Sequence, residues 1–571
     1  MPANKLQGLG AARTWWRVHI KRPLKRHEWG VVVGLWVVAF ALGVSGYIAQ
    51  ATSAHRAFWV PQIVYQALQL FTFKGGEKFG FINSQLEIAR WLAPSVAVYT
   101  ASKGLVSLFY EQAQLLRARM LRRHVIICGL SDKGRLIARS FLDRGDRVVI
   151  IDRDSSRGKL AIPRSEGAVV ICGQADDPEV LRAAGIRRAR YIIATCDDAT
   201  NAEIVVQARS LRREADGRLD CLVHVGDPGL LDALGDLAGR LDHSRRFGVR
   251  FFNLFEMGAR TLLTECPPFG LLDEGDKAVA VGLNVTDAFG ACVLRELAMR
   301  WAIRVGPEGP ALSLVALDDA TAKALSDHLA SEPALNRLVV VSALNSRDLD
   351  ESLSVAYVLD AEPDDATERA LELRTWLPPS TRLVVRYPRE AGLSRLLATD
   401  DVDACAQIEV FAIYERTCSN PDLLLGAQID EVARGLNDFY RSEVNSGSPS
   451  WDQLAETYRN ASRQQAEWIF RILADSGFTV VVGPAAKSTI LEFTNAEVER
   501  LSRIEHARWC AERTLEGWTY APERDDARKH HDNLVSWERL SEPIRDYDRK
   551  FVRHWPRLLA DPSIGFEIVR T

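Results

Sequence analysis

A run of apolar positions near the start of the chain, from Gly30 to Gln50, contains no charged side chain. As a helix it is long enough to cross about 30 Å of hydrocarbon, so it predicts a transmembrane span. A secretory signal has a shorter apolar core, so we expect this segment to remain in the mature protein. A second apolar stretch, Trp91–Tyr110, is also long enough to span, although Lys103 interrupts it. The pattern therefore predicts two membrane helices.

Beyond these spans, short apolar runs alternate with helical patterns, which predicts a parallel, doubly wound sheet. The predicted strands of this Rossmann-like unit are HVIICGL, DRVVIID, AVVICG, YIIATC, CLVHVG and VRFFNL. A second unit of the same kind is predicted from Lys277 by KAVAVGL, LSLVALDD, LVVVSAL, VAYVLDAE, RLVVRYP and IEVFAIYE. Between them, LFEMGARTLLTECPPFG predicts an amphipathic helix that ends at prolines.

A polar linker, Asn445–Ser450, precedes a third module. We therefore expect a membrane protein with two transmembrane α-helices and a pore-like re-entrant loop, two α/β units with parallel sheets, and a mainly α-helical C-terminal module. The expected boundaries are a basic N-terminus over 1–29, the two-span region over 30–120, the Rossmann-like units over 121–275 and 276–444, and the last module over 451–571.

Basic residues predict the orientation of the spans. They are concentrated before the first span, from Lys5 to Arg26, and after the second, from Arg117 to Arg123. Both termini are therefore expected on the cytoplasmic side of the inner (plasma) membrane. Nine cysteines without a CxxC pair favour reduced thiols over a disulfide frame or a zinc site. With a net charge of -3, the basic zone is interpreted as a topology signal, and no nucleic-acid partner is expected.

The turn after the first predicted strand has a nucleotide-binding pattern. Gly129, Ser131 and Gly134 stand where a dinucleotide fingerprint has three glycines, and the Cβ of Ser131 disfavours close docking of a pyrophosphate. The helix that follows offers its N-terminus to an anion, and Asp152 lies at a strand tip where a carboxylate can hold ribose hydroxyls. The alternative is a purely structural turn with a solvated Asp152.

The last module contains IEHARWCAERTLEGWTY, which begins at Ile504. On a helix, Glu505 and Trp509 share a face, as do Arg508 and Glu512. Aromatic rings beside arginines and histidines suit a stacking pocket. Spacing alone favours the other interpretation, a buried helical core with a salt-bridged rim.

The segment from Arg122 to Phe255 resembles the TrkA-N or RCK domain, which regulates potassium channels and transporters. The resemblance is carried by HVIICGLSDKGRLIARSFLDRGDRVVIIDRD and by GQADDPEVLRAAGIRRARYIIATCDDATNAEIVVQAR. It implies a ligand over the strand tips, either NAD or an adenine or cyclic nucleotide, and pairing of units into a ring. The matching ligand positions are Gly129, Ser131, Gly134, Asp152, Arg153, Gln174, Ala175 and Thr195.

The C-terminal region, from about Trp451 to Ile568, resembles the RyR domain named for the repeats of ryanodine receptors. Bacterial RyR domains beside TrkA-N modules are viewed as sensors of nucleotide-type messengers. The resemblance implies a ligand pocket at Asn460, Arg463, Glu505, His506, Arg508, Trp509, Glu512, Trp518, Tyr520 and Trp537.

The loop between the spans predicts a re-entrant pore segment. YQALQLFTF suits a short helix and KGGEKFG a glycine-rich return, but neither matches the Thr-Val-Gly-Tyr-Gly potassium filter. In the second span, Lys103 either snorkels to the interface or forms a cationic ring that disfavours cations, and Gly104 suits a bend. The predicted pore residues are Thr72, Phe73, Lys74, Gly75, Gly76, Lys103 and Gly104.

Together these features predict a ligand-gated ion channel, a homotetramer in the lipid bilayer whose cytoplasmic modules bind a nucleotide-type ligand. We see no Walker lysine, no catalytic acid–base group and no metal-ligand cluster, so an enzyme is not expected. Two alternatives stay open: a membrane-anchored nucleotide-binding enzyme and a non-conducting regulatory subunit of a transporter.

Overall fold

The computed structural model describes residues 28–53, 59–72, 83–154, 167–213, 216–231, 234, 247–270, 280–284, 287–343, 353–397, 408–443, 447–454, 456–482 and 490–570. The chain divides into two compact units, Met1–Leu116 and Arg117–Thr571, and each is described by itself.

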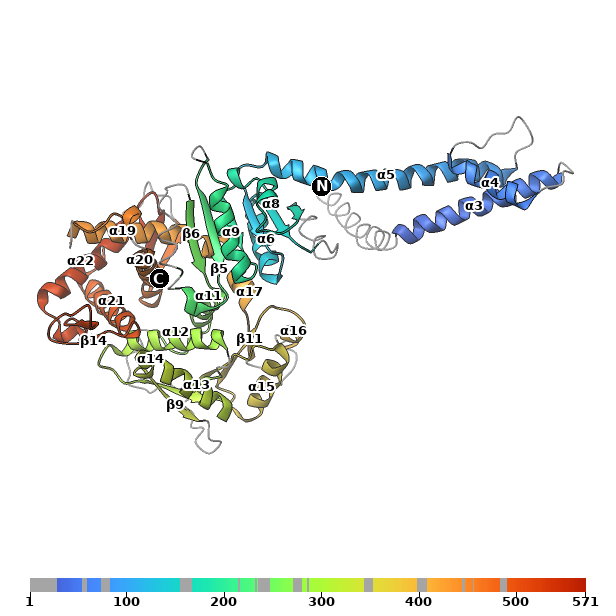
Figure 1. The fold of residues 1–571 in the computed structure, drawn as a ribbon. Helices are drawn as coiled ribbons and strands as arrows, with labels where there is room; N and C mark the ends of the chain where they lie inside the picture. The colour runs from blue at the N-terminus through green and yellow to red at the C-terminus, as the bar shows by residue number, and fades with distance from the viewer. Residues whose placement is uncertain are drawn as a thin grey trace, which may run out of the picture. The chain divides into compact units, whose positions relative to one another are not determined.

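The first unit is a helical assembly of α3 (Glu28–Ser53), α4 (Val60–Gln69), η2 (Leu70–Thr72) and most of α5 (Ser84–Met120). Small residues let α3 and α5 approach closely (Figure 1): a Cβ on Gly46 would lie 3.0 Å from the backbone nitrogen of Leu86. Among the described helices, Val32–Ser53 is the stretch that is long and apolar enough to cross a membrane. The helix predicted for the second span is confirmed within α5, while its membrane crossing stays a prediction.

The second unit contains a six-stranded parallel sheet with the order β3-β2-β1-β4-β5-β6, so the predicted doubly wound sheet is confirmed. Its strands are apolar and buried because helices cover both faces. They are β1 (Val125–Cys128), β2 (Val148–Asp152), β3 (Val169–Cys172), β4 (Tyr191–Ala194), β5 (Leu219–His224) and β6 (Phe247–Phe252). The accompanying helices are α6 (Asp132–Asp143), α8 (Pro178–Ala183), η3 (Ile186–Arg188), α9 (Asp198–Ser210) and η4 (Pro228–Leu230).

The predicted second copy is also confirmed, because the next parallel sheet has the order β9-β8-β7-β10-β11-β12, which repeats that of the first. Its strands are β7 (Ala280–Leu283), β8 (Leu312–Ala316), β9 (Val339–Ala343), β10 (Leu353–Val358), β11 (Arg382–Tyr387) and β12 (Ile408–Ala412). Its helices are α12 (Ala288–Val305), α13 (Asp319–Ser331), α14 (Pro333–Asn336), α15 (Pro363–Trp376) and α16 (Leu393–Leu397).

The two Rossmann-like units exchange helices. The predicted amphipathic helix is α11 (Leu254–Glu265). It follows β6 of the first Rossmann-like unit, yet it buries Leu262 and Leu263 in the core of the second Rossmann-like unit. In return, α17 (Ile413–Cys418) and α18 (Pro421–Leu425) follow β12 and bury Cys418 and Leu424 in the core of the first Rossmann-like unit. Separating the units would therefore expose apolar surface on both.

The C-terminal part is mainly helical and begins with α19 (Ala427–Glu443), which packs on α20 (Glu456–Asp475) and α22 (Glu542–Leu559). A capping box at Thr494 starts α21 (Asn495–Leu515), and β13 (Phe478–Val482) pairs antiparallel with β16 (Phe566–Arg570). The remaining elements are η6 (Trp451–Gln453), β14 (Thr519–Tyr520), β15 (His530–His531) and η7 (Trp537–Arg539).

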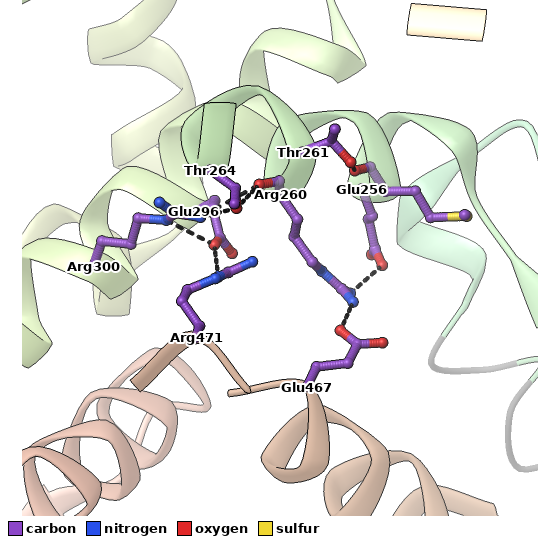
Figure 2. Close-up of polar contacts among 9 residues, drawn as sticks. Glu256, Arg260, Thr261, Thr264, Glu296, Arg300, Glu467 and Arg471 are labelled. Carbon is purple, nitrogen blue, oxygen red and sulfur yellow. Dashed lines mark hydrogen bonds and ion pairs between the residues drawn. The ribbon is translucent and has the colours of Figure 1, made fainter. Parts of the chain in front are cut away.

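A buried ionic cluster joins this part to the Rossmann-like units (Figure 2). The carboxylate of Glu296 on α12 accepts from Arg300 Nε at 3.0 Å and from Arg471 Nη1 of α20 at 2.6 Å. On α11, Arg260 Nη1 donates to Glu467 of α20 at 2.5 Å. Burial alone would raise the pKa of Glu296, but Arg471, Arg300 and Arg260 hold it below its ordinary value. Helices from three parts of the chain thus share one set of charges.

We predict that Arg471→Ala lowers the free energy of unfolding by about 2–3 kcal/mol, because it removes one of the two guanidinium groups that bind a buried carboxylate. The matched control is Arg503→Ala, whose guanidinium is exposed and pairs with Glu538 at 2.8 Å. An exposed pair contributes about 0–1 kcal/mol. Urea unfolding of the purified protein measures both, and equal effects would contradict a buried cluster.

Candidate ligand-binding sites

The turn after β1 is held tightly against the start of α6. Gly129 has a φ of +93°, which favours glycine, and a Cβ on Gly134 would lie 2.0 Å from the carbonyl oxygen of Gly129. The hydroxyl of Thr195, buried at the end of β4, donates to the carbonyls of Cys128 at 2.9 Å and Gly129 at 3.2 Å. Three predicted residues therefore meet in this turn.

Asp152 lies beside this turn at the end of β2. Its Oδ2 accepts from the backbone N–H of Leu130 at 2.5 Å, and its Oδ1 from that of Asp154 at 2.8 Å. A carboxylate has about four lone-pair sites, so these two bonds leave acceptors for hydroxyl groups of a ligand. The structure thus places an oriented carboxylate next to a glycine turn.

The other predicted positions line the rim or the interior. Ser131 is an exposed N-cap whose side chain makes no capping hydrogen bond with the described residues. Arg153 is largely exposed, with its Nη2 3.9 Å from Asp176 Oδ2, and Gln174 is exposed. Ala175 is buried in the interior, so it contributes packing and no polar group.

Two residues of this site were missed by sequence reasoning. Asn201 on α9 is buried, donates to the carbonyls of Cys196 at 3.1 Å and His224 at 2.9 Å, and accepts from Cys196 N–H at 2.9 Å. It fixes the ends of β4 and β5. Lys133 is half-buried in the first turn of α6, and burial lowers the pKa of its ammonium, which lies within electrostatic range of Cys418 and Asp198. For Asn201, the signal in the sequence was a side-chain amide in the first turn of the helix that follows a predicted strand.

In the C-terminal part, the ion pairs that we expected at the rim of a buried helical core lie inside it. Arg508 is buried; its Nε donates to Glu505 Oε2 at 2.8 Å, its Nη2 to Glu505 Oε1 at 3.0 Å, and its Nη1 to Glu512 at 2.6 Å. Glu505 also accepts from Gln465 at 2.8 Å. Burial alone would lower the pKa of Arg508, but the two carboxylates raise it above its ordinary value. These charges are engaged within the protein, which leaves little capacity for a ligand.

His506 lies between a thiol and a carboxyl, with Cys510 Sγ 3.4 Å from its Nε2 and Asp548 Oδ2 3.7 Å from its Nδ1. Because Nε2 is 2.9 Å from the carbonyl oxygen of Val535, which can only accept, Nε2 carries the proton. It therefore cannot take a proton from Cys510, whose pKa burial raises well above the usual range. This arrangement does not provide an activated nucleophile.

Two of the predicted aromatic residues, Trp509 and Trp518, lie beside His531. The ring of Trp509 lies 4.9 Å from His531 and that of Trp518 6.1 Å from it, both edge-on. Trp537 donates from Nε1 to Glu499 at 2.8 Å, and Tyr520 is exposed with the Arg539 guanidinium over its ring.

The two predicted residues on α20 have different partners. Arg463 Nε donates to Asp430 of α19 at 2.6 Å, and its Nη1 donates to Asn460 Oδ1 at 2.5 Å. The contact with Asp430 ties α20 to α19.

Of the predicted pore residues, Phe73, Lys74, Gly75 and Gly76 lie outside the described residues. Thr72 ends η2 and its hydroxyl donates to the Gln69 carbonyl at 3.0 Å. The Lys103 ammonium lies 5.7 Å from the centre of the Tyr99 ring, and α5 continues through Gly104 without a break. In the part of the chain that the structure describes, no group of three or more His, Cys, Asp or Glu side chains could hold a metal ion.

We predict that Gly134→Ala lowers the free energy of unfolding by about 1–3 kcal/mol, because its Cβ would force the Gly129 carbonyl away from α6. Gly217→Ala is the control, since no described atom outside the adjacent residues lies within 4 Å of its Cβ position. Denaturant unfolding measures both variants; a neutral Gly134→Ala would show that the turn is not tightly packed.

Asp548 provides a pH test. Burial, followed by repulsion from Glu505, raises the pKa of its carboxyl from 3.8 to about 7. Between these two pH values the folded protein holds a proton that the unfolded chain has lost, so the contribution of Asp548 to stability falls as the pH rises. We expect Asp548→Asn to be more stabilising, relative to wild type, at pH 8 than at pH 5. The exposed neighbour Asp546→Asn should show no such trend in thermal unfolding.

Comparison with known proteins places two of these regions in families. Residues 125–234 match the TrkA-N domain, and residues 486–568 match the RyR domain. Potassium channel protein 1 of Methanocaldococcus jannaschii is 30% identical over 119 residues, which cover 19% of this chain and 36% of that protein. An uncharacterised protein of Methanothermus fervidus is 33% identical over 144 residues, covering 21% of this chain and 23% of that protein. The chain thus spans about a third or less of these curated relatives.

The GsuK channel bound to NAD is similar at 16% identity, with 84% of this chain and 89% of that chain covered and a TM-score of 0.32. The structure of GsuK bound to ADP is similar at 18% identity, with 71% and 98% covered and a TM-score of 0.36. Such low scores add no support to an assignment of ligand. From the two domain matches, the chain contains a TrkA-N domain of the RCK type and a RyR domain, and it resembles an archaeal potassium channel protein.

Proposed function

We propose that the chain is a ligand-gated ion channel in which a nucleotide-type ligand, bound by the cytoplasmic modules, gates a two-span pore formed by four copies in the plasma membrane. The proposal keeps the boundaries predicted above, with the spans in 30–120, Rossmann-like units in 121–275 and 276–444, and the RyR module in 451–571. Both termini then face the cytoplasm.

The observation that carries the proposal is how α5 is joined to the first Rossmann-like unit. Helix α5 ends at Met120 and β1 begins at Val125, so few residues separate a helix with an apolar segment from the central strand of a sheet. Within these residues, His124 is fully buried, with its Nε2 2.9 Å from the Ala184 carbonyl, and Arg123 has a φ of 52°. Because the side chain of His124 is fixed in the protein, this short linker would pass a displacement of the first sheet on to α5.

Further contacts fix the last turn of α5. The carbonyl of Arg119 accepts a hydrogen bond from the Arg188 guanidinium, and Arg123 N–H donates to the Arg188 carbonyl at 2.7 Å. A Cβ on Gly185 would lie 3.2 Å from the Ala118 carbonyl. The segment 184–190 leads into β4, so the site that contains Thr195 and the end of α5 are connected through one strand.

Two observations support an ion channel with a nucleotide-type ligand. The match to an archaeal potassium channel protein supports conduction, although the predicted loop contains no known potassium filter. The carboxylate of Asp152 beside the glycine turn supports recognition of ribose. A ligand gates such a channel only through differential affinity, and a 100-fold preference for one state supplies about 2.7 kcal/mol per site.

The test is ion flux from liposomes that contain the purified protein, under potassium, sodium or chloride gradients, with NAD, adenine nucleotides or cyclic nucleotides added. We expect flux that depends on one of these ligands. Ligand binding without flux under any gradient would contradict the channel and favour a regulatory subunit, while turnover of the ligand would favour an enzyme.

A linker variant tests the coupling. Inserting three glycines between Leu121 and Arg122 should leave ligand affinity within about twofold of wild type and abolish the dependence of flux on ligand, because a flexible linker absorbs displacement. The control inserts the same residues after Gly477, in the turn between α20 and β13. Gating that survives the first insertion would show that α5 does not carry the signal.

A further inference from the structure

A hollow of about 240 Å³ lies between the second Rossmann-like unit and the RyR module. One wall comes from the end of α12 and the loop after it, including Trp301 and Pro310, and the other from Trp518, Thr519 and Tyr520. Ligand sites occur preferentially between domains, and pockets for drug-sized molecules measure about 300–1,000 Å³. This hollow therefore fits one base and its sugar, and it is too small for a dinucleotide.

The walls offer aromatic surface. Trp301 is buried, and its Nε1 is held by the Pro310 carbonyl at 2.7 Å, so this ring is fixed in place. Trp518 is half-buried and Tyr520 is 49% exposed, so both rings present surface to an incoming molecule. Stacking on such rings suits any planar base.

The rim offers positive charge. Arg337 is an exposed lining residue whose side chain makes no ion pair or hydrogen bond with other described residues. Arg539 does not line the hollow itself, but its guanidinium lies 5.5 Å from the centre of the ring of Tyr520, which does, and it donates to Glu308 Oε1 at 2.6 Å. Both partners of this ion pair are about half exposed, so the pair is weak and a phosphate can displace Glu308.

We propose that this hollow binds a mononucleotide, either a nucleoside monophosphate or a cyclic mononucleotide, with its base against Trp518 and Tyr520 and its phosphate between Arg337 and Arg539. The inference rests on the proposed function for its role and adds a second ligand site, separate from the strand edge at Asp152. Because its walls belong to different modules, a bound ligand favours the arrangement in which the modules are docked. The site thus links messenger binding to the contact between the RyR module and α12.

The test measures binding of AMP and of cyclic AMP to the full-length protein in detergent by titration calorimetry, with adenosine and inorganic phosphate as single-part probes. We expect AMP or cyclic AMP to bind at least tenfold more tightly than either part alone. Arg337→Ala and Trp518→Ala should each weaken binding at least tenfold. Exposed residues outside the hollow provide the matched controls Arg395→Ala and Tyr458→Ala, which should leave affinity unchanged.

Glu308→Gln adds a variant that gains affinity. Removing the carboxylate frees Arg539 and removes repulsion of the phosphate, so mononucleotide affinity should rise severalfold, whereas a hollow without a ligand predicts no change. The proposal is overturned if neither mononucleotide binds, or if binding is unaffected by Arg337→Ala and Glu308→Gln and is lost in Asp152→Ala. Ligand-dependent flux that is unchanged by the hollow variants would contradict this site and support the channel. Mononucleotide binding in the hollow without any flux would support this site and contradict the channel.

Discussion

The carboxylate of Glu296 is enclosed by protein, and the packing of α11, α12 and α20 depends on how it is neutralised. A buried ion costs several kcal/mol unless opposite charges and hydrogen bonds compensate. Its two partners come from different helices, Arg300 on α12 and Arg471 on α20. Arg300 also donates to Thr264 on α11 at 3.0 Å, so three helices are aligned by one set of charges. Separating α20 from α12 would remove Arg471 from this carboxylate and leave Arg300 as its partner.

Apolar runs bounded by turn residues were sufficient to predict both sheets, because a strand that is buried on both faces has a nearly continuous apolar sequence. The exchange of helices between the two Rossmann-like units could not be predicted from the pattern of apolar residues. Cys418 and Leu424 lie in a short apolar stretch that reads the same whether it packs on its own sheet or on the other one. The amphipathic pattern of α11 was visible, but its partner surface was not.

In the candidate sites too, local contacts could be predicted from the sequence and long-range contacts could not. Local spacing predicted that Arg508 pairs with Glu512, because these residues are one helical turn apart, and the turn at Gly129 followed from glycine positions. The long-range partners were not predictable: Leu130 N–H for Asp152, Gln465 for Glu505 and Asp430 for Arg463. Since the three guanidinium nitrogens of Arg508 all donate to carboxylates, the ligand contacts that we propose for the RyR module are assigned to its aromatic rings and its exposed arginines.

The locked linker between α5 and β1 also bears on the sign of regulation. A floppy tether transmits only tension, so it can pull a helix in one direction and is slack in the other. A linker pinned at His124 and at the Arg119 carbonyl behaves as a stiff lever, which transmits push as well as pull. In the channel that we propose, activation and inhibition therefore need no different connection, because ligands of opposite effect would displace the sheet in opposite directions.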